Sequence, residues 1–333
     1  MILEQQNPGH RLSGRGLVPN LDLSGVRQVL SLPRVLGAGA LVVLQLFGNG
    51  CASPAKRMDA TAEALGFTRS VVTTPVFAHR LYARLNEQPP PTLHVYLDGD
   101  GSPWLGRYVV SADPTPRNPM VLQLMAADPS PSVYLGRPCY HGLRAPRCTP
   151  KLWTQERYSE AVVASMTDAL RQVIAMIGTR RVVLIGYSGG GTLAMLLAER
   201  LPETAAVLTV AGNLAVAQWA AYHRYSPLRG SLDPASRGAL QTDVQQIHLA
   251  GGRDGNAPAR LAEHVCKRQQ TAWLIVFDEF DHTCCWRSIW PEVLQRTLNL
   301  PAGADAVDLC PLSGYPCRAT FCGPGGGRDP RVR

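Results

Sequence analysis

The chain has 333 residues, of which 45% are hydrophobic and only 17% are charged. This composition argues against a largely disordered protein and allows a sizeable core, in one large domain or in two small ones. Half of the net charge of +8 comes from residues 1–57, and no zinc-finger or RNA-recognition pattern follows, so nucleic-acid binding is not expected.

Residues 1–57 are predicted to be a targeting leader. They carry six Lys and Arg residues against two acids, which gives four of the eight net positive charges. The uncharged run Val35–Phe47 has the length of a signal-peptide core and is too short for a full membrane span. Cys51 resembles the cysteine of a bacterial lipoprotein cleavage site, although Gly48 replaces the usual Leu. Cleavage after Ala52 and an uncleaved anchor helix are the alternatives.

The leader implies an exported protein of the bacterial periplasm or cell envelope, and Cys51 is its candidate lipid anchor. Nine cysteines fit that oxidising compartment, because eight of them, an even number, remain once Cys51 is set aside. Cys139 and Cys148 flank a short loop and are a candidate disulfide, whereas the other pairings stay open. A metal site is the competing interpretation, but there is no C-x-x-C pair, and the adjacent Cys284 and Cys285 lack zinc-cluster spacing.

Residues 58–302 are predicted to form one domain in which strands and helices alternate. Residues 67–85 contain two strands joined around Pro75, which is typical of an antiparallel hairpin. Six further strands are predicted from apolar runs at 92–99, 132–139, 181–188, 204–212, 244–252 and 271–280. Apolar residues at helical spacing predict helices at 157–178, 191–201, 257–269 and 288–300. The alternation predicts a mostly parallel central sheet with helices on both faces.

Residues 213–240 interrupt this alternation and are too long for a simple connection. Leaving Trp219, Tyr222 and Tyr225 fully wet without a function would be costly, which favours a short lid over the strand ends rather than a wandering surface loop. Residues 303–333 are rich in Gly and Pro and contain three cysteines, and we expect a loosely ordered tail there.

The sequence Gly-Tyr-Ser-Gly-Gly at 186–190 joins a predicted strand directly to a predicted helix. A serine on such a tight turn has a strained backbone, and Gly186 and Gly190 remove collisions with the neighbouring strand and helix. The pattern predicts Ser188 as a nucleophile, with the N–H of Gly189 at the helix start as a donor to an oxyanion. A turn that is Gly-rich for packing alone is one alternative. A phosphate loop is another, but the P-loop lysine and the G-x-G-x-x-G spacing are missing.

A serine hydroxyl becomes a good nucleophile only beside a base that an acid orients. Asp254 lies just beyond the strand at 244–252, and His282 lies just beyond the strand at 271–280. Both residues follow Ser188 in the chain and lie at strand ends, which predicts Asp254 as the acid and His282 as the base. The alternatives are Asp243, Asp278 and Asp281 for the acid, and His248 and His264 for the base.

A second oxyanion donor is expected from the Gly-rich turn after the strand at 92–99. The N–H belongs to Asp100, Gly101 or Ser102, with Asp100 preferred, and a turn without a catalytic role is the alternative. A carboxylate here departs from the familiar His-Gly loop. It would discourage anionic acyl groups unless the side chain points away.

Together these residues resemble the α/β-hydrolase superfamily, over roughly Phe67 to Leu300. The segments VYLDGDGSPW, DPTPRNP, GYSGGG and DHTCCW are similar to those of bacterial exported hydrolases, often lipoproteins, that are described as esterases. The resemblance implies an α/β-hydrolase fold, and the chemistry expected of it needs no metal or organic cofactor. It also implies that Ser188 is the nucleophile and that Gly189 and Asp100 are the oxyanion donors. Asp254 would be the orienting acid, and His282 the base.

The first functional expectation is a serine hydrolase that cleaves carboxylic esters or thioesters through an acyl-enzyme. Its substrate would be a small-molecule or lipid-like ester. An envelope peptidase or acyltransferase on the same three residues is the second expectation, and a non-catalytic envelope lipoprotein is the third. The sequence specifies neither the acyl length nor the oligomeric state.

Overall fold

The computed structural model describes residues 52–106, 108–298, 309–310 and 314–323. Most of the predicted leader, including Val35–Phe47 and Cys51, lies outside the described residues. Within them, no helix is both long enough and apolar enough to cross a membrane.

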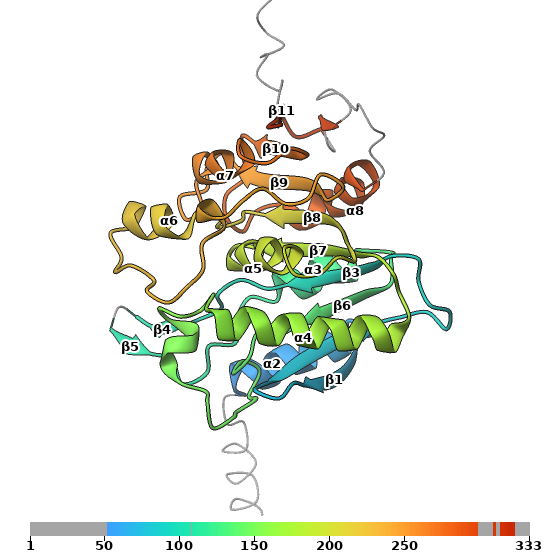
Figure 1. The fold of residues 1–333 in the computed structure, drawn as a ribbon, viewed down its shortest axis with the longest axis vertical. Coiled ribbons are helices and arrows are strands. Elements are labelled where there is room, and N and C mark those ends of the chain that lie inside the picture. The colour runs from blue at the N-terminus through green and yellow to red at the C-terminus, as the bar shows by residue number, and fades with distance from the viewer. Residues whose placement is uncertain (1–51, 107, 299–308, 311–313, 324–333) are drawn as a thin grey trace, which may run out of the picture. The chain divides into compact units, whose positions relative to one another are not determined.

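Nine strands of the described chain form one mixed sheet, in the order β1-β2-β6-β3-β7-β8-β9-β10-β11 (Figure 1). The sheet is parallel from β6 to β10, as predicted, and the pairs β1/β2, β2/β6 and β10/β11 are antiparallel. The strands are β1 Thr68–Thr73, β2 Ala78–Arg84, β3 Leu93–Leu97, β6 Ser132–Leu135, β7 Val182–Tyr187, β8 Thr204–Val210, β9 Gln245–Gly251, β10 Ala272–Phe277 and β11 Cys317–Phe321.

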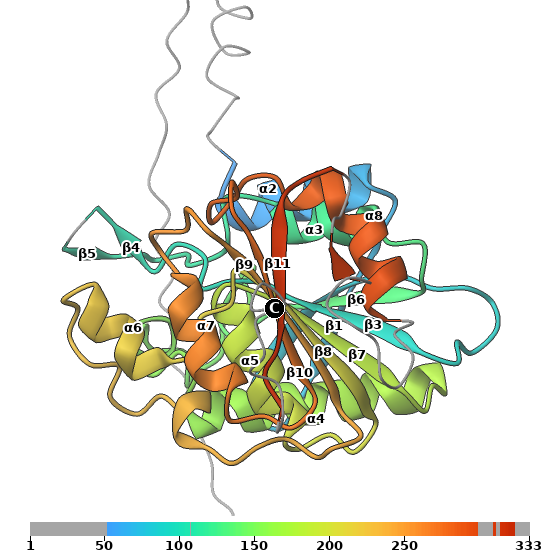
Figure 2. The same ribbon diagram turned by 90° about the horizontal axis from the view of Figure 1, so that it is seen from above.

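Helices cover both faces of the sheet, which explains why its parallel strands are apolar on both sides (Figure 2). One face carries α4 Glu160–Ile177, α5 Gly189–Ala198 and α7 Ala259–Cys266, and the other carries α2 Pro54–Ala64, α3 Met120–Ala126 and α8 Trp286–Thr297. Each face has its own apolar core, with Leu170 and Leu193 in one and Ile289 and Trp290 in the other. Each such buried side chain stabilises the fold by roughly 1.5–3 kcal/mol.

Two elements near the start of the described chain were not expected from the sequence. α2 begins at Pro54, inside the predicted leader, where the Ser53 hydroxyl caps it by accepting the Lys56 N–H at 3.3 Å. A short hairpin follows β3 and consists of β4 Trp104–Leu105 and β5 Val109–Val110.

The strand β11 lies within the predicted tail. Ile275 faces Ala319 across the antiparallel pair with β10, and Cys322 just beyond β11 is disulfide-bonded to Cys266 on α7. The expected loose order of residues 303–333 therefore does not hold for this stretch, because a main-chain ladder and a covalent bond both fix it.

Every described cysteine belongs to a disulfide. The predicted pair Cys139–Cys148 is present. The remaining pairs are Cys266–Cys322, Cys284–Cys285 and Cys310–Cys317. The eight cysteines beyond Cys51 thus form four disulfides, as an oxidising compartment allows.

Residues 213–240 contain α6 Val216–Tyr222 and the short 3-10 turn η2 Pro234–Ser236. The Asp233 carboxylate joins these two elements. It accepts the Val216 N–H at the start of α6 at 3.0 Å and the Ala235 N–H in η2 at 3.0 Å. The segment is therefore built around a helix and a shared cap, and is not a wandering loop.

Candidate active site

Ser188 stands on the turn between β7 and α5 with a strained backbone, at φ 52° and ψ −121°. Three main-chain hydrogen bonds hold this turn. The Ser188 N–H donates to Val210 O at 2.9 Å, and Ser188 O accepts from the N–H groups of Gly191 at 2.9 Å and Asn213 at 3.0 Å. The strain is therefore balanced by contacts to β8 and to the segment that follows it.

The glycines around Ser188 are required by close approaches of main-chain atoms. A Cβ at Gly186 would collide with the carbonyl group of Gly190, in the first turn of α5. A Cβ at Gly190 would collide with the carbonyl group of Leu97, at the end of β3. The helix therefore starts closer to the sheet than any residue with a side chain would allow.

The structure brings Ser188, Asp254 and His282 together. The Ser188 Oγ lies 3.0 Å from His282 Nε2, and Asp254 Oδ2 lies 2.8 Å from His282 Nδ1. Because an ionised carboxylate only accepts, Nδ1 carries the proton in this arrangement, and Nε2 is left to accept the serine proton. In this tautomer, the ring of His282 can accept a proton from the Ser188 hydroxyl.

Asp254 has its other oxygen occupied. Its Oδ1 accepts the N–H groups of Asn256 and Ala257, each at 2.8 Å. The side chain is fully buried, and these bonds fix its orientation toward the ring of His282.

The ring of His282 packs against Tyr187, with ring centroids 5.1 Å apart. Two sets of hydrogen bonds fix the loop that carries His282. The main-chain carbonyl oxygen of His282 accepts from the Tyr187 hydroxyl and the Trp286 indole N–H, each at 3.2 Å. The Asp281 carboxylate accepts the Thr283 and Cys284 N–H groups, each at 2.7 Å.

Three of the five alternative acids and bases have other partners in the described chain, and two are exposed. Asp278 pairs with Arg318, and Asp281 caps its own loop. His248 is buried in β9, where Nδ1 lies 3.0 Å from the Thr209 hydroxyl. Asp243 and His264 are exposed.

Within the described residues, the main-chain N–H groups of Gly189, Asp100 and Gly101 donate to no protein acceptor. The Ser102 N–H donates to Pro114 O at 2.9 Å, which removes Ser102 from the alternatives. The loop with Asp100 passes beside the turn that carries Ser188, since a Cβ at Gly99 would lie 3.3 Å from the Ser188 Cβ.

No protein-family model and no curated protein sequence matches the chain. Among solved structures, it is similar to an esterase from Pyrococcus furiosus, at 13% identity and a TM-score of 0.50, over 75% of this chain and 97% of that one. It is also similar to an acylaminoacyl peptidase from Pyrococcus horikoshii, at 12% identity and a TM-score of 0.50, over 74% of this chain and 44% of that one. The chain has the α/β-hydrolase fold. At these identities the likeness concerns the fold alone.

In this α/β-hydrolase fold, the Asp100 side chain is held by three buried donors that the sequence did not reveal. Oδ1 accepts from Arg137 Nη2 at 2.9 Å and from the Tyr158 hydroxyl at 2.6 Å, and Oδ2 accepts from Arg157 Nη1 at 2.7 Å. Burial alone would raise the pKa of Asp100, but Arg157, Arg137 and the Tyr158 hydrogen bond outweigh it and hold that pKa below its usual value.

This cluster packs directly on the start of α5. A Cβ at Gly189 would collide with the Asp100 carboxylate and with the Tyr158 hydroxyl. Two guanidinium groups face one carboxylate, so the cluster is net positive beside the free N–H groups. The expected repulsion between this carboxylate and an anion is therefore offset by Arg137 and Arg157.

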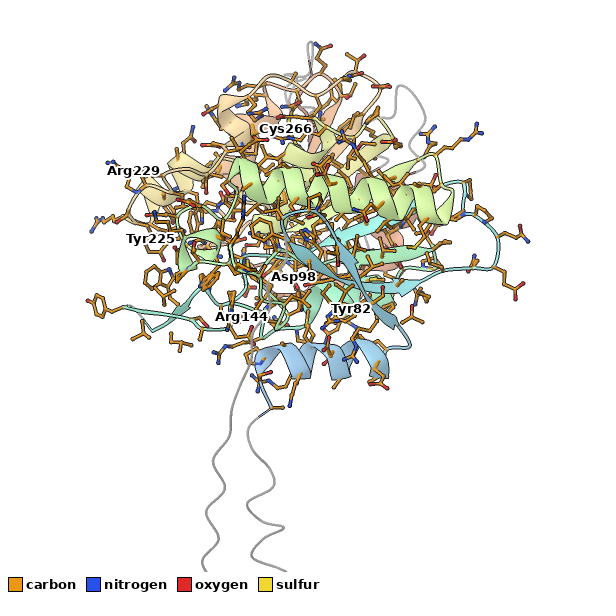
Figure 3. All side chains as sticks on the ribbon, turned by 60° about the horizontal axis from the view of Figure 1, so that its bottom comes forward. Tyr82, Asp98, Arg144, Tyr225, Arg229 and Cys266 are labelled. Atoms are coloured by element: carbon orange, nitrogen blue, oxygen red, sulfur yellow. A yellow bond between two sulfur atoms is a disulfide. The ribbon has the colours of Figure 1, made fainter. Side chains whose placement is uncertain are left out.

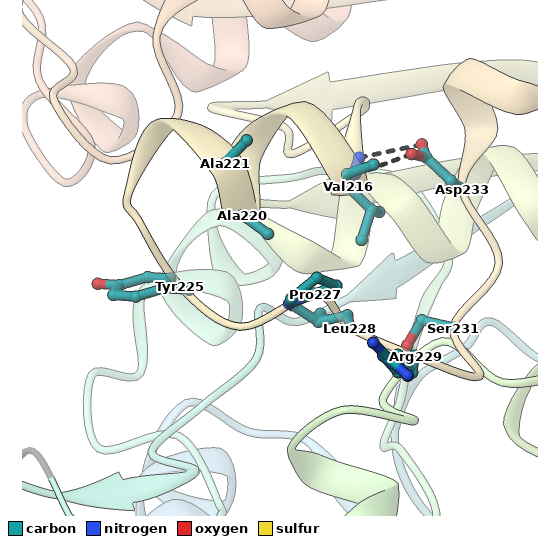
Figure 4. Close-up of a pocket in the computed structure, with 10 residues that line it drawn as sticks. Val216, Ala220, Ala221, Tyr225, Pro227, Leu228, Arg229, Ser231 and Asp233 are labelled. Atoms are coloured by element: carbon teal, nitrogen blue, oxygen red, sulfur yellow. Dashed lines mark hydrogen bonds between the residues drawn. The ribbon is translucent and has the colours of Figure 1, made fainter.

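The segment 213–240 borders the site on two sides. The Trp219 indole N–H donates to Asn256 O at 2.9 Å, in the loop that carries Asp254, and the Leu232 N–H donates to Tyr158 O at 2.9 Å. A cavity of about 240 Å³ lies between α6 and the loop that returns from it (Figure 4). Its lining is mostly apolar and includes Val216, Ala217, Ala220, Ala221, Tyr225, Pro227 and Leu228.

The described residues contain no cluster of three or more His, Cys, Asp or Glu side chains that could hold a metal ion.

Proposed function

We propose that the protein is a serine hydrolase that cleaves carboxylic esters, including thioesters, through an acyl-enzyme. The observation that carries the proposal is the placement of the His282 ring between the Ser188 hydroxyl and the buried Asp254 carboxylate, at 3.0 and 2.8 Å. A packing-only turn would need the glycines but would not need this chain of hydrogen bonds.

In the first half of the reaction, Ser188 Oγ attacks the ester carbonyl while His282 Nε2 takes its proton. The carbonyl oxygen becomes an oxyanion and receives hydrogen bonds from the Gly189 and Asp100 N–H groups. Collapse of this intermediate breaks the bond to the alcohol, which leaves with the proton from His282. The acyl group remains on Ser188.

In the second half, water gives a proton to His282 Nε2 and attacks the acyl carbonyl. The tetrahedral intermediate breaks its bond to Ser188 Oγ, which regains the proton, and the acid is released. Asp254 stays ionised throughout, holds the Nδ1 proton in place and stabilises the imidazolium. Binding of the oxyanion by fixed donors is typically worth about 3–4 kcal/mol for each donor.

We further propose that the enzyme acts in the cell envelope, with Cys51 as a lipid anchor. The four disulfides among the described residues support an oxidising compartment. Labelling of cells with a radioactive fatty acid, with Cys51→Ser as the control variant, tests the anchor.

The hydrolase proposal is tested by labelling with a fluorophosphonate probe and by hydrolysis of p-nitrophenyl esters of increasing acyl length. We expect Ser188→Ala to abolish labelling and to lower kcat at least about 10³-fold. Ser70→Ala, on the exposed strand β1, is the matched control. Labelling or hydrolysis that survives in Ser188→Ala would overturn the proposal.

Amide substrates and added alcohol acceptors distinguish an ester hydrolase from a peptidase and from an acyltransferase that use the same three residues. Faster turnover of amides than of matched esters would make the protein a peptidase. Transfer of the acyl group to an alcohol in preference to water would make it an acyltransferase.

A further inference from the structure

The hairpin β4–β5 presents large apolar side chains to solvent. Trp104, Leu105, Tyr108 and Val109 are all exposed, Tyr108 by 86% and Trp104 by 42%. Among the described strands, the hairpin pairs only with itself, Trp104 facing Val110 and Leu105 facing Val109. A two-stranded hairpin gains little from its own packing, so four exposed apolar side chains on it call for a function.

Two exposed tyrosines lie on the same side of the domain as the β4–β5 hairpin. Tyr222 ends α6, and Tyr225 follows it. Figures 1 and 2 both show α6 and the β4–β5 hairpin on this side. The two elements follow the C-terminal ends of the parallel strands β8 and β3, the end of the sheet at which Ser188 follows β7. We call these six side chains the rim surface: Trp104, Leu105, Tyr108, Val109, Tyr222 and Tyr225.

The segments around the rim surface are positively charged. Residues 101–112, 139–151 and 214–232 follow β3, β6 and β8 and contain no Asp or Glu. The last two contribute four exposed arginines, which are Arg144, Arg147, Arg224 and Arg229. Figure 3 shows Arg229 on the side that also carries Tyr225. Arg144 is tied to the base of the hairpin, because its Nη2 donates to Ala112 O at 2.6 Å.

We propose that the rim surface binds the surface of a lipid bilayer that contains anionic phospholipid, and that it places the Ser188 site against esters held there. Trp and Tyr combine an apolar ring with one polar atom and favour the boundary between acyl chains and water. The surrounding arginines complement anionic headgroups. Binding itself does not depend on catalysis, whereas delivery of esters rests on the proposed function.

A second copy of the chain is a poorer fit for this surface. Two rims facing each other would bring eight exposed arginine side chains together without a single acid from these three segments. Like charges across an interface cost free energy, so the charge pattern favours an anionic partner.

Trp104 supplies a local probe of the proposed contact. The chain has six tryptophans, and the other five are no more than 9% exposed, so Trp104 alone samples solvent in the structure. With the full chain carrying Cys51→Ser, we expect vesicles of phosphatidylcholine and phosphatidylglycerol to shift its emission to the blue. Brominated acyl chains should quench it. Pure phosphatidylcholine or high salt should weaken both effects, since screening removes the headgroup attraction.

The rim side chains are tested by vesicle sedimentation. We expect the double variant Leu105→Ser and Tyr108→Ser to bind vesicles about tenfold more weakly. Met176→Ser is the matched control, because Met176 is a large apolar side chain on α4 that is 69% exposed. Ser188→Ala should bind vesicles like the unsubstituted chain, which separates failure of this proposal from failure of the hydrolase proposal.

An unquenched Trp104 in the Cys51→Ser chain would overturn the proposal, and this readout needs no substitution in the rim surface. Equal vesicle binding by the double variant and Met176→Ser would also overturn it. A change from dimer to monomer in the double variant, with vesicle binding unaffected, would assign the rim surface to contacts between copies of the chain.

Discussion

The Tyr158 hydroxyl donates a 2.6 Å hydrogen bond to Asp100 Oδ1 and thereby links the start of α4 to the loop that carries the Asp100 N–H, the proposed oxyanion donor. The carboxylate positions the Asp100 N–H, because the same residue carries both groups. Fixing this loop before the reaction avoids reorganisation when the oxyanion forms. Tyr158 is therefore a positioning residue in the proposed mechanism.

We expect Tyr158→Phe to lower kcat about tenfold, which corresponds to about 1.4 kcal/mol of lost transition-state stabilisation, and to leave KM nearly unchanged. Steady-state hydrolysis of a short-chain ester measures both constants. Tyr82→Phe is the matched control, because Tyr82 also donates to a carboxylate, that of Asp59 at 2.7 Å, and belongs to the apolar core on the other face of the sheet. An unchanged kcat in Tyr158→Phe would mean that Arg137 and Arg157 hold the loop without help.

Gly190→Ala is expected to inactivate the enzyme. Its Cβ would collide with the Leu97 carbonyl group at the end of β3, and neither main-chain segment can move without disturbing Ser188. The cost in stability should be roughly 1–3 kcal/mol, as for other overpacked sites. Gly238→Ala is the control, since a Cβ there meets nothing within 4 Å. Fluorophosphonate labelling and thermal unfolding report the two effects, and full labelling of Gly190→Ala would refute the collision.

Asp98 gives the fold a pH dependence. Burial raises the pKa of Asp98 from 3.8 to about 7 and outweighs the Gly99 N–H, the Tyr134 hydroxyl and the charge of Arg137, which lower it. The folded state thus binds a proton more tightly than the unfolded state does. Proton binding by Asp98 therefore stabilises the folded state. This contribution to the free energy of unfolding is fully present below pH 3.8 and is lost as the pH rises through about 7. Its size is on the order of 4 kcal/mol.

Asp98→Asn should remove this dependence. The amide can keep the bond from the Gly99 N–H, and it can donate to Tyr134, whose hydroxyl then donates to His141 Nε2, 3.1 Å away. Denaturant unfolding from pH 5 to pH 8 should show the unsubstituted chain losing stability relative to the variant. Parallel curves for the two proteins would show that the Asp98 carboxyl does not titrate in this range.

Loss of the Cys266–Cys322 disulfide is expected to destabilise the fold more than loss of Cys139–Cys148. The two bonds close loops with sequence separations of 56 and 9 residues. The chain-entropy relation gives about 4 and about 3 kcal/mol, respectively. Thermal midpoints of the two double alanine variants test the order, and the reverse order would show that local contacts dominate over loop closure.

The three residues of the hydrogen-bonded chain could be located from the sequence because each follows an apolar strand in the required order. Ser188, Asp254 and His282 all have local signals, namely glycines on both sides or a polar residue directly after a buried run. Parallel strands then bring these ends to one edge of the sheet. The same alternation predicted the sheet and the helices on both faces.

The partners of Asp100 could not be found in this way. Arg137 and Arg157 lie 37 and 57 residues from it, and only the folded chain brings them together. The hairpin β4–β5 has strands of two residues, too short for alternation to appear. β11 was missed because its order depends on pairing with β10 and on Cys322, not on its own composition.

The position of β11 has a consequence for the integrity of the molecule. Without residues 317–321, β10 would present an unsatisfied row of N–H and C=O groups along its whole length, a template onto which another chain can add a strand. Proteolytic removal of this short segment should therefore make the domain prone to intermolecular β-pairing and precipitation, even with Ser188, Asp254 and His282 still in place.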